Sequence, residues 1–303
     1  MNLVMTGSLG HVGRPLVAQL VHKKHNVTVV TSKPERKAEI EAMGAKASVG
    51  SVEDRAFLST AFQGADAVFL LIAPGGAFVD HELDIGAKFR LITENFSAAI
   101  EAAGIRSVVY LSSIGAHLGS DNGLLKFHHA AEGILDKLAQ VSLVVLRPAG
   151  FYTNLFGYLP TIKSQGMIFS GYGDKKGPWV SPLDIAEAAA EELEALGAGP
   201  VQAGSRKVRY VASEELSGQE VARILGQAIG KPELKWAIVP DQQLKQGMVG
   251  AGMPAFIAEA MVEMQASQRS GKLYEDYHRS RPVLGRVKLA EFAKEFAAVY
   301  SKS

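Results

Sequence analysis

Residues 1–13 decide the fold, and they read Met1-Asn2-Leu3-Val4-Met5-Thr6-Gly7-Ser8-Leu9-Gly10-His11-Val12-Gly13. The run 2–6 predicts a short buried strand, and the apolar pattern of 15–22 predicts a helix. Three glycines lie between them at three-residue intervals. A glycine-rich turn that enters a helix directs free backbone N–H groups and the positive end of the helix dipole at an anion. The stretch therefore predicts a site for phosphate.

Each glycine of this loop has a separate predicted role. Gly7 supplies a tight turn, Gly10 lets a pyrophosphate approach the backbone, and Gly13 lets the helix pack closely on the sheet. The spacing is G-x-x-G-x-x-G rather than the usual G-x-G-x-x-G, and such a loop can also serve only as a tight strand–helix connection. Because strand, loop and helix follow in order, we expect a dinucleotide site. Its predicted contacts are Thr6, Gly7, Ser8, Leu9, Gly10, His11, Val12 and Gly13.

Strand and helix patterns alternate over residues 1–150. Continuous apolar runs, which suit strands covered on both faces, predict strands at Leu3–Thr6, Val27–Thr31, Ala67–Ile72, Ser107–Leu111 and Leu143–Leu146, with a weaker candidate at Ala45–Val49. Helical patterns lie between them at Val12–Lys23, Pro34–Met43, Arg55–Phe62, His81–Ala103 and Leu124–Ala139. This alternation predicts an α/β fold with a doubly wound parallel sheet, a Rossmann domain.

After Gly150 the pattern becomes irregular and aromatic. We expect residues 151–303 to form a smaller α+β substrate domain, which could also lend elements back to the first. Helices are predicted at Asp184–Ala195, Ser217–Ile229, Asp241–Gln265 and Lys288–Tyr300, and strands at Val208–Ala212 and Leu234–Val239.

Composition excludes several classes of function. The 303 residues carry a net charge of +1 with interspersed signs, so no basic face for nucleic acid is expected. The absence of cysteine excludes disulfides and thiolate chemistry, and the eight histidines show no metal-ligand spacing. No apolar run reaches the roughly 18 residues that cross a bilayer, and no signal peptide is evident. We expect a cytoplasmic monomer or homodimer with a small-molecule substrate and no metal.

The residues after the second predicted strand indicate the type of dinucleotide. No acid that would bind a free ribose 2′-hydroxyl occupies positions 30–33. Ser32, Lys33 and Arg36 instead supply the hydroxyl and the cations that a 2′-phosphate needs. The two cations could also merely solvate the start of a surface helix. The sequence predicts NADP(H).

Several motifs, in order, resemble the NmrA-like group of atypical short-chain dehydrogenases/reductases, which includes NADPH-dependent quinone reductases, triphenylmethane reductase and redox-sensing regulators. The motifs span residues 6–13, 64–71, 109–113, 146–154, 184–186 and 217–222. The resemblance implies that Ile72, Ala73, Pro74 and Pro148 also contact the cofactor. The chain departs from the group at Ser32, where members often carry Arg, and at Ser51, where an Asp usually faces adenine.

The catalytic Tyr-x-x-x-Lys pair of typical members is missing, because no tyrosine lies between Tyr110 and Tyr152. Ser113, at a strand end, and His128, on the following helix, are the candidate catalytic residues, since each can hydrogen-bond an acceptor oxygen. His128 could equally be a surface residue paired with Glu132 at i,i+4.

Four residues are predicted to line a substrate pocket: Ser112, Phe151, Tyr152 and Asn154. The aromatic cluster among them could equally form a seam between the domains. Hydride transfer to a conjugated acceptor needs positioning more than a strong acid. We therefore expect an NADPH-dependent oxidoreductase that transfers a hydride to a small conjugated carbonyl or quinone-like acceptor. The alternative is a non-catalytic NADP(H)-binding redox sensor of the NmrA type.

Overall fold

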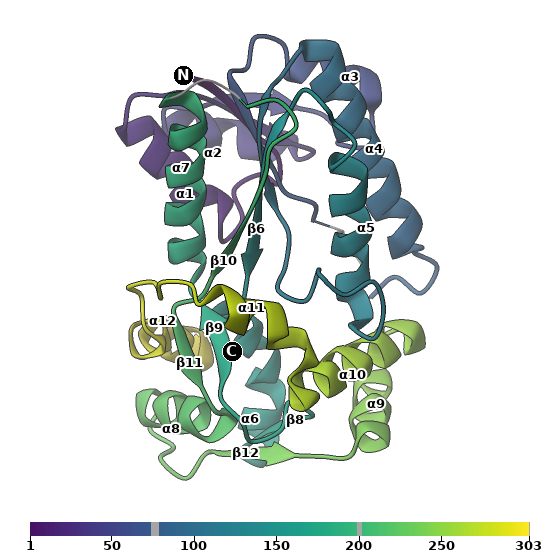
Figure 1. The fold of residues 1–303 in the computed structure, drawn as a ribbon. Coiled ribbons are helices and arrows are strands. Elements are labelled where there is room, and N and C mark those ends of the chain that lie inside the picture. Colours follow the sequence, from purple (N-terminus) through teal and green to yellow (C-terminus); the bar gives the residue numbers. More distant parts are fainter. Residues whose placement is uncertain (74–78, 199–201, 303) are drawn as a thin grey trace.

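A seven-stranded sheet forms the centre of the computed structural model, which describes residues 1–73, 79–198 and 202–302 (Figure 1). The strand order is β10-β6-β5-β4-β1-β2-β3, and every neighbouring pair is parallel. The predicted doubly wound α/β fold is confirmed. The strands are β1 (Asn2–Met5), β2 (Asn26–Thr31), β3 (Lys46–Val49), β4 (Ala67–Leu70), β5 (Ser107–Leu111), β6 (Ser142–Pro148) and β10 (Arg206–Val211).

Helices cover both faces of this sheet. On one face lie α1 (Gly13–His22), α2 (Lys37–Ala42) and α7 (Pro182–Ala198), and on the other α3 (Arg55–Ala61), α4 (Ile85–Ala103) and α5 (Lys126–Leu135) (Figure 1). Successive residues of a strand point to opposite faces, so in β5 Val109 packs with α1 and α7 while Val108 and Tyr110 pack with α4 and α5. Burial on both sides explains the continuous apolar runs of the strands.

The chain order reverses at β1, which lies between β4 and β2. The backbone amide of Thr6 donates to the carbonyl of Phe69 at 3.0 Å and continues the β1–β4 pairing past the end of β1. In open parallel sheets, ligands bind in the crevice at the carboxyl ends of the strands where this reversal occurs. The glycine-rich loop follows β1 at this edge.

Residues after 150 contribute to both parts of the molecule. β10 pairs with β6 as the sheet's edge strand, and α7 packs against α1. The remaining segments lie beyond the carboxyl ends of the strands and carry a core of their own that includes Trp179, Trp236 and Phe296 (Figure 1). They are β7 (Gly150–Phe151), α6 (Leu159–Gln165), β8 (Met167–Ser170), β9 (Gly177–Val180), β11 (Glu214–Leu216), α8 (Gly218–Ala228), β12 (Lys235–Ile238), α9 (Asp241–Gly250), α10 (Ala255–Ser270), α11 (Glu275–Ser280) and α12 (Leu289–Lys302).

The predicted helices differ from the observed ones by one to four residues at one end or both, and one predicted helix is divided in two. The helix expected over 241–265 is two helices, because Gly252 has a left-handed φ of +91° and Pro254 cannot continue a helix from the preceding turn. The helix expected from His81 begins at Ile85, where the Asp84 carboxylate accepts a hydrogen bond from the Ala87 amide at 2.9 Å.

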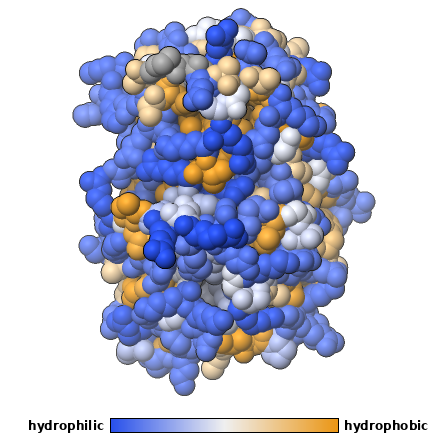
Figure 2. Space-filling model, in the orientation of Figure 1, coloured by the Kyte–Doolittle hydropathy of each residue, from blue (hydrophilic) through white to orange (hydrophobic). Residues whose placement is uncertain are grey.

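Polar residues cover most of the face shown in Figure 2, and hydrophobic residues there form small, separate patches. No helix within residues 1–73, 79–198 and 202–302 combines the length and apolarity needed to cross a membrane.

Candidate functional site

The loop after β1 is shaped by two glycines that no other residue could replace without a clash. Gly7 has a φ of +90°, and a Cβ atom there would lie 2.7 Å from Leu71 Cδ2. A Cβ on Gly13 would lie 2.0 Å from the carbonyl oxygen of Ser8. The Thr6 hydroxyl donates to the Leu71 carbonyl at 3.1 Å and accepts from the Leu71 amide at 2.8 Å, which joins the ends of β1 and β4.

Gly10 leaves an open place in the loop. The nearest atom to a Cβ built there is the Gly7 carbonyl oxygen at 3.9 Å, and Gly10 is exposed. The backbone amides of His11 and Val12 donate no hydrogen bond to any residue that the structure describes, and α1 begins directly after them at Gly13. Free donors, an open approach and a helix N-terminus fit a pyrophosphate group.

Cationic and hydroxyl groups surround this loop. Arg36 Nη1 donates to the Leu9 carbonyl at 3.0 Å, so its guanidinium is fixed beside the loop. Ser8 donates to the Thr31 hydroxyl at 3.0 Å, and the exposed residues Ser32 and Lys33 follow at the end of β2. These groups fit a phosphate on the adenine-side ribose.

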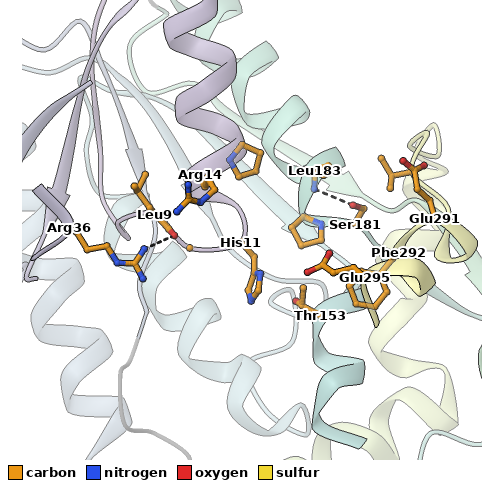
Figure 3. Close-up of a pocket in the computed structure, with 14 residues that line it drawn as sticks. Leu9, His11, Arg14, Arg36, Thr153, Ser181, Leu183, Glu291, Phe292 and Glu295 are labelled. Atoms are coloured by element: carbon orange, nitrogen blue, oxygen red, sulfur yellow. Dashed lines mark hydrogen bonds between the residues drawn. The ribbon is translucent and has the colours of Figure 1, made fainter. Parts of the chain in front are cut away.

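A cavity of about 650 Å³ opens beside the glycine-rich loop (Figure 3). Figure 3 shows His11 and Arg14 on the loop side and Thr153, Phe292 and Glu295 on the other side. The sequence analysis missed Arg14 and the wall from α12, since nothing local to those residues indicates which helix face meets the loop. The lining residues are Leu9, Gly10, His11, Arg14, Pro15, Arg36, Thr153, Ser181, Pro182, Leu183, Val287, Glu291, Phe292 and Glu295.

The two serines after β5 lie at the same strand edge. The Ser112 amide donates to the Leu146 carbonyl at 2.8 Å and extends the pairing of β5 with β6. Its side chain is buried, and its hydroxyl donates to Glu132 Oε1 of α5 at 2.5 Å. Ser113 follows, half-buried. The Ser112 hydroxyl therefore already donates its hydrogen bond to a residue of α5.

His128 lies between α4 and α5 rather than in the wall of the cavity. Its Nδ1 is 2.9 Å from the hydroxyl of the fully buried Tyr110, and its ring meets Phe89 edge-on with centroids 5.2 Å apart. Burial lowers the pKa of His128 to about 4, against a smaller opposite effect of Glu132. Burial also raises the pKa of Tyr110, so the phenol keeps its proton and can donate it to Nδ1. A neutral imidazole then presents Nε2–H as a donor.

Glu132 pairs with two arginines and not with His128. Its carboxylate accepts from Arg147 at 2.6 and 3.0 Å and from Arg206 at 2.6 Å. Arg147 also donates to Tyr210 at 3.0 Å and to Asp276 at 3.3 Å. Burial opposes the charge of Arg147, but these partners outweigh it and raise its pKa. This network, which the sequence analysis missed, joins α5, β6, β10 and α11.

The predicted pocket residues after β6 have three different environments. Phe151 is half-buried, and Asn154 is exposed. Tyr152 is fully buried in the core of the later residues, where its hydroxyl donates to Glu214 at 2.6 Å. The reason is packing, because its ring lies 5.6 Å from that of Phe292 of α12. Tyr152 therefore belongs to the core of the residues after 150, and neither to an open pocket wall nor to a seam with the first 150 residues.

The remaining predicted cofactor residues lie at the sheet edge. Ile72 is buried and Ala73 exposed just after β4, and Pro148 is buried at the end of β6. Pro74 lies outside the described residues. Among the residues that are described, no three His, Asp or Glu side chains could hold a metal ion together.

Comparisons with known proteins agree with this geometry. Residues 7–195 match the model of the NAD(P)H-binding family. The chain is 27% identical over 302 residues to the NAD(P)H azoreductase of Xenophilus azovorans, covering 98% of this chain and 99% of the relative. It is 21% identical to quinone oxidoreductase 2 of Escherichia coli, covering 93% of each.

Solved structures share the fold. The NADPH complex of the Escherichia coli NADPH-dependent quinone oxidoreductase QOR2 superposes with a TM-score of 0.80 at 21% identity, covering 97% of this chain and 99% of the other. The triphenylmethane reductase of Citrobacter sp. gives 0.74 at 21% identity, covering 98% and 100%. The relatives support an oxidoreductase as the class of this protein. The chain belongs to the NAD(P)H-binding family.

Proposed function

We propose that this protein is an NADPH-dependent reductase that transfers a hydride to a small conjugated acceptor, a quinone or a conjugated carbonyl. The observation that carries this proposal is the glycine-rich loop, with free amides at the start of α1 and Arg36 fixed on the Leu9 carbonyl. This arrangement supports binding of a phosphorylated dinucleotide at the sheet edge. When bound there, the nicotinamide supplies the hydride.

The groups near the acceptor side favour an acceptor that needs no strong acid. The hydroxyl groups of the two nearby tyrosines already form hydrogen bonds inside the protein, Tyr110 with His128 and Tyr152 with Glu214. His128 is neutral near pH 7 and can donate a hydrogen bond from Nε2 without losing a charge. We propose that His128 and Ser113 orient the acceptor oxygen in this way, and that Phe151 and Asn154 border the acceptor. A quinone accepts a hydride without prior protonation of its carbonyl oxygen, so donors that only form hydrogen bonds are sufficient.

The residues after 150 are proposed to supply the acceptor side. Thr153, the neighbour of Asn154 in the chain, lines the cavity opposite His11 (Figure 3). The proposed acceptor residues His128, Ser113, Phe151 and Asn154 are not among its lining residues, so the proposed acceptor place is distinct from this cavity. Relatives that match nearly the whole chain include reductases, which supports catalysis over a purely sensing role.

The test is consumption of NADPH by the purified protein against para-quinones, conjugated aldehydes and an azo dye, with NADH in parallel. We expect turnover with NADPH that falls at least about tenfold in His128→Ala, which corresponds to the loss of one hydrogen bond of about 1.4 kcal/mol. His129→Ala is the matched control, because His129 is exposed and contacts the Ala116 carbonyl instead of Tyr110. Tight NADPH binding without turnover on any acceptor would contradict the proposal and favour the sensor.

A further inference from the structure

Two arginines in the wall of the cavity converge on one carboxylate that does not line it. Arg14 extends from the first turn of α1, and Arg36 ends the short 3-10 helix η1 (Pro34–Arg36). Both contact Glu39 of α2: Arg14 Nη2 forms an ion pair with Oε1, and Arg36 Nη1 lies 3.6 Å from Oε2. The arginines line the cavity (Figure 3), while Glu39 is not among its lining residues.

Glu39 is not needed to hold Arg36 in place. The guanidinium of Arg36 already donates to the Leu9 carbonyl at 3.0 Å, and that carbonyl belongs to the loop whose shape the glycines fix. The 3.6 Å separation from Glu39 is a contact between charges and is too long for a hydrogen bond. Glu39 therefore accepts a hydrogen bond from Arg14, and at Arg36 its main effect is to cancel positive charge.

The anion that fits the wall is a phosphate monoester. It carries close to two negative charges near pH 7 and is bound well by guanidinium groups, whereas a ribose hydroxyl gains nothing from the positive charge. A carboxylate beside the same arginines repels such an anion and competes for their N–H groups.

We propose that Arg14 joins Arg36 in binding the 2′-phosphate of NADPH, and that Glu39 is a specificity-determining residue that limits the preference for NADPH over NADH. This inference rests on the proposed use of NADPH. Ser32, Lys33 and Arg36 are the predicted contacts of this phosphate. The inference adds Arg14 as a further cation and Glu39 as an acid that weakens phosphate binding.

The test measures dissociation constants of NADPH and NADH for the full-length protein by the change in nicotinamide fluorescence. Glu39→Gln should lower the NADPH constant about three- to tenfold and leave the NADH constant within about twofold, the size expected for one partly exposed charge. The gain should shrink at high salt, which screens the exposed groups. Glu41→Gln is the matched control, because Glu41 lies on the same helix and carries the same charge, and the ion pair of its carboxylate among the described residues is with Lys37, at 3.9 Å.

Arg14→Gln tests the other half of the proposal. It should raise the NADPH constant at least about fivefold with little change for NADH, since Glu39 would then face Arg36 alone. An NADPH constant that is unchanged or higher in Glu39→Gln overturns the role of Glu39, and so does an equal gain in Glu41→Gln. An unchanged constant in Arg14→Gln overturns the role of Arg14. A parent protein that binds NADH as tightly as NADPH overturns the proposed NADPH preference itself and leaves the reductase activity to its own assay.

Discussion

The glycine-rich loop and the ion-pair network around Glu132 are built by different means. The loop is contiguous, and glycines at 7 and 13 set its backbone conformation, so one stretch of eight residues forms the turn into α1. The network joins Glu132, Arg147, Arg206 and Asp276, which come from four separate elements. The loop presents unpaired donors to a ligand, whereas the network pairs its charges internally.

Because of this difference, we expect the loop to serve ligand binding and the network to serve the stability of the fold. The amides of His11 and Val12 donate to no described residue, so the crevice keeps hydrogen-bonding capacity for a ligand. Arg147 and Glu132 have side chains only 7% and 4% exposed, so each depends on the other to remain charged inside the protein. Damage to the loop should therefore affect cofactor binding, and damage to the network should affect the free energy of unfolding.

The largest effect is expected for Glu132→Gln. Among the described residues, the substitution leaves the buried Arg147 with only the partly exposed Asp276 as a charged partner. We therefore expect a loss of about 3–5 kcal/mol in the free energy of unfolding, measured by urea denaturation. The matched control is Glu259→Gln at the exposed pair with Lys245, where the change should stay within about 0.5 kcal/mol. NADPH affinity of the folded Glu132→Gln protein should stay within about twofold of the parent. A loss in stability near that of the control would mean that the network is not a stabilising one.

A second substitution tests the loop. In Gly13→Ala the new methyl group would meet the Ser8 carbonyl oxygen at 2.0 Å, and backbone atoms must move to relieve the clash. We expect a loss of about 2–4 kcal/mol in the free energy of unfolding and NADPH binding weakened by at least about tenfold. Gly133→Ala is the control, because a Cβ atom there meets nothing within 4 Å and alanine should stabilise α5 by about 0.5–1 kcal/mol. Unchanged NADPH affinity in Gly13→Ala would show that the loop geometry does not govern binding.

The same contrast explains what could be predicted from the sequence. The loop, the strands of the sheet and the helix that Ser217 caps depend on residues close together in the chain, and the structure has each of them. The capping box of Ser217 with Glu220 is a signal of this local kind. β10 was predicted as a strand, but its pairing with β6 depends on contacts across some sixty residues that no local pattern reports.

The candidate site was predictable only on its cofactor side. Glu132 was noted for a local pairing with His128, yet it pairs with Arg147, fifteen residues away in sequence, because both residues are buried between α5 and the sheet. The aromatic pattern around Tyr152 indicates burial but not which core receives the ring. Nothing in the sequence around Arg14 distinguishes it from a surface arginine. Its contact with Glu39 forms only because α1 and α2 lie side by side.

The smallest effect expected is a pH dependence of stability from His128, which packs against Tyr110 and Phe89. Its pKa is lowered to about 4 in the folded protein and returns to near 6.5 on unfolding, so between these values the unfolded chain binds more protons. Stability from this residue is therefore complete above about pH 6.5 and is lost as the pH falls toward 4. Between pH 7 and pH 5 the parent should lose about 2 kcal/mol more than His128→Gln in urea denaturation. His129→Gln, which leaves the contact with Tyr110 intact, should keep the parent's pH profile. Identical profiles for the parent and His128→Gln would mean that His128 titrates freely, and its Nε2 would then lose the neutral donor role proposed for it.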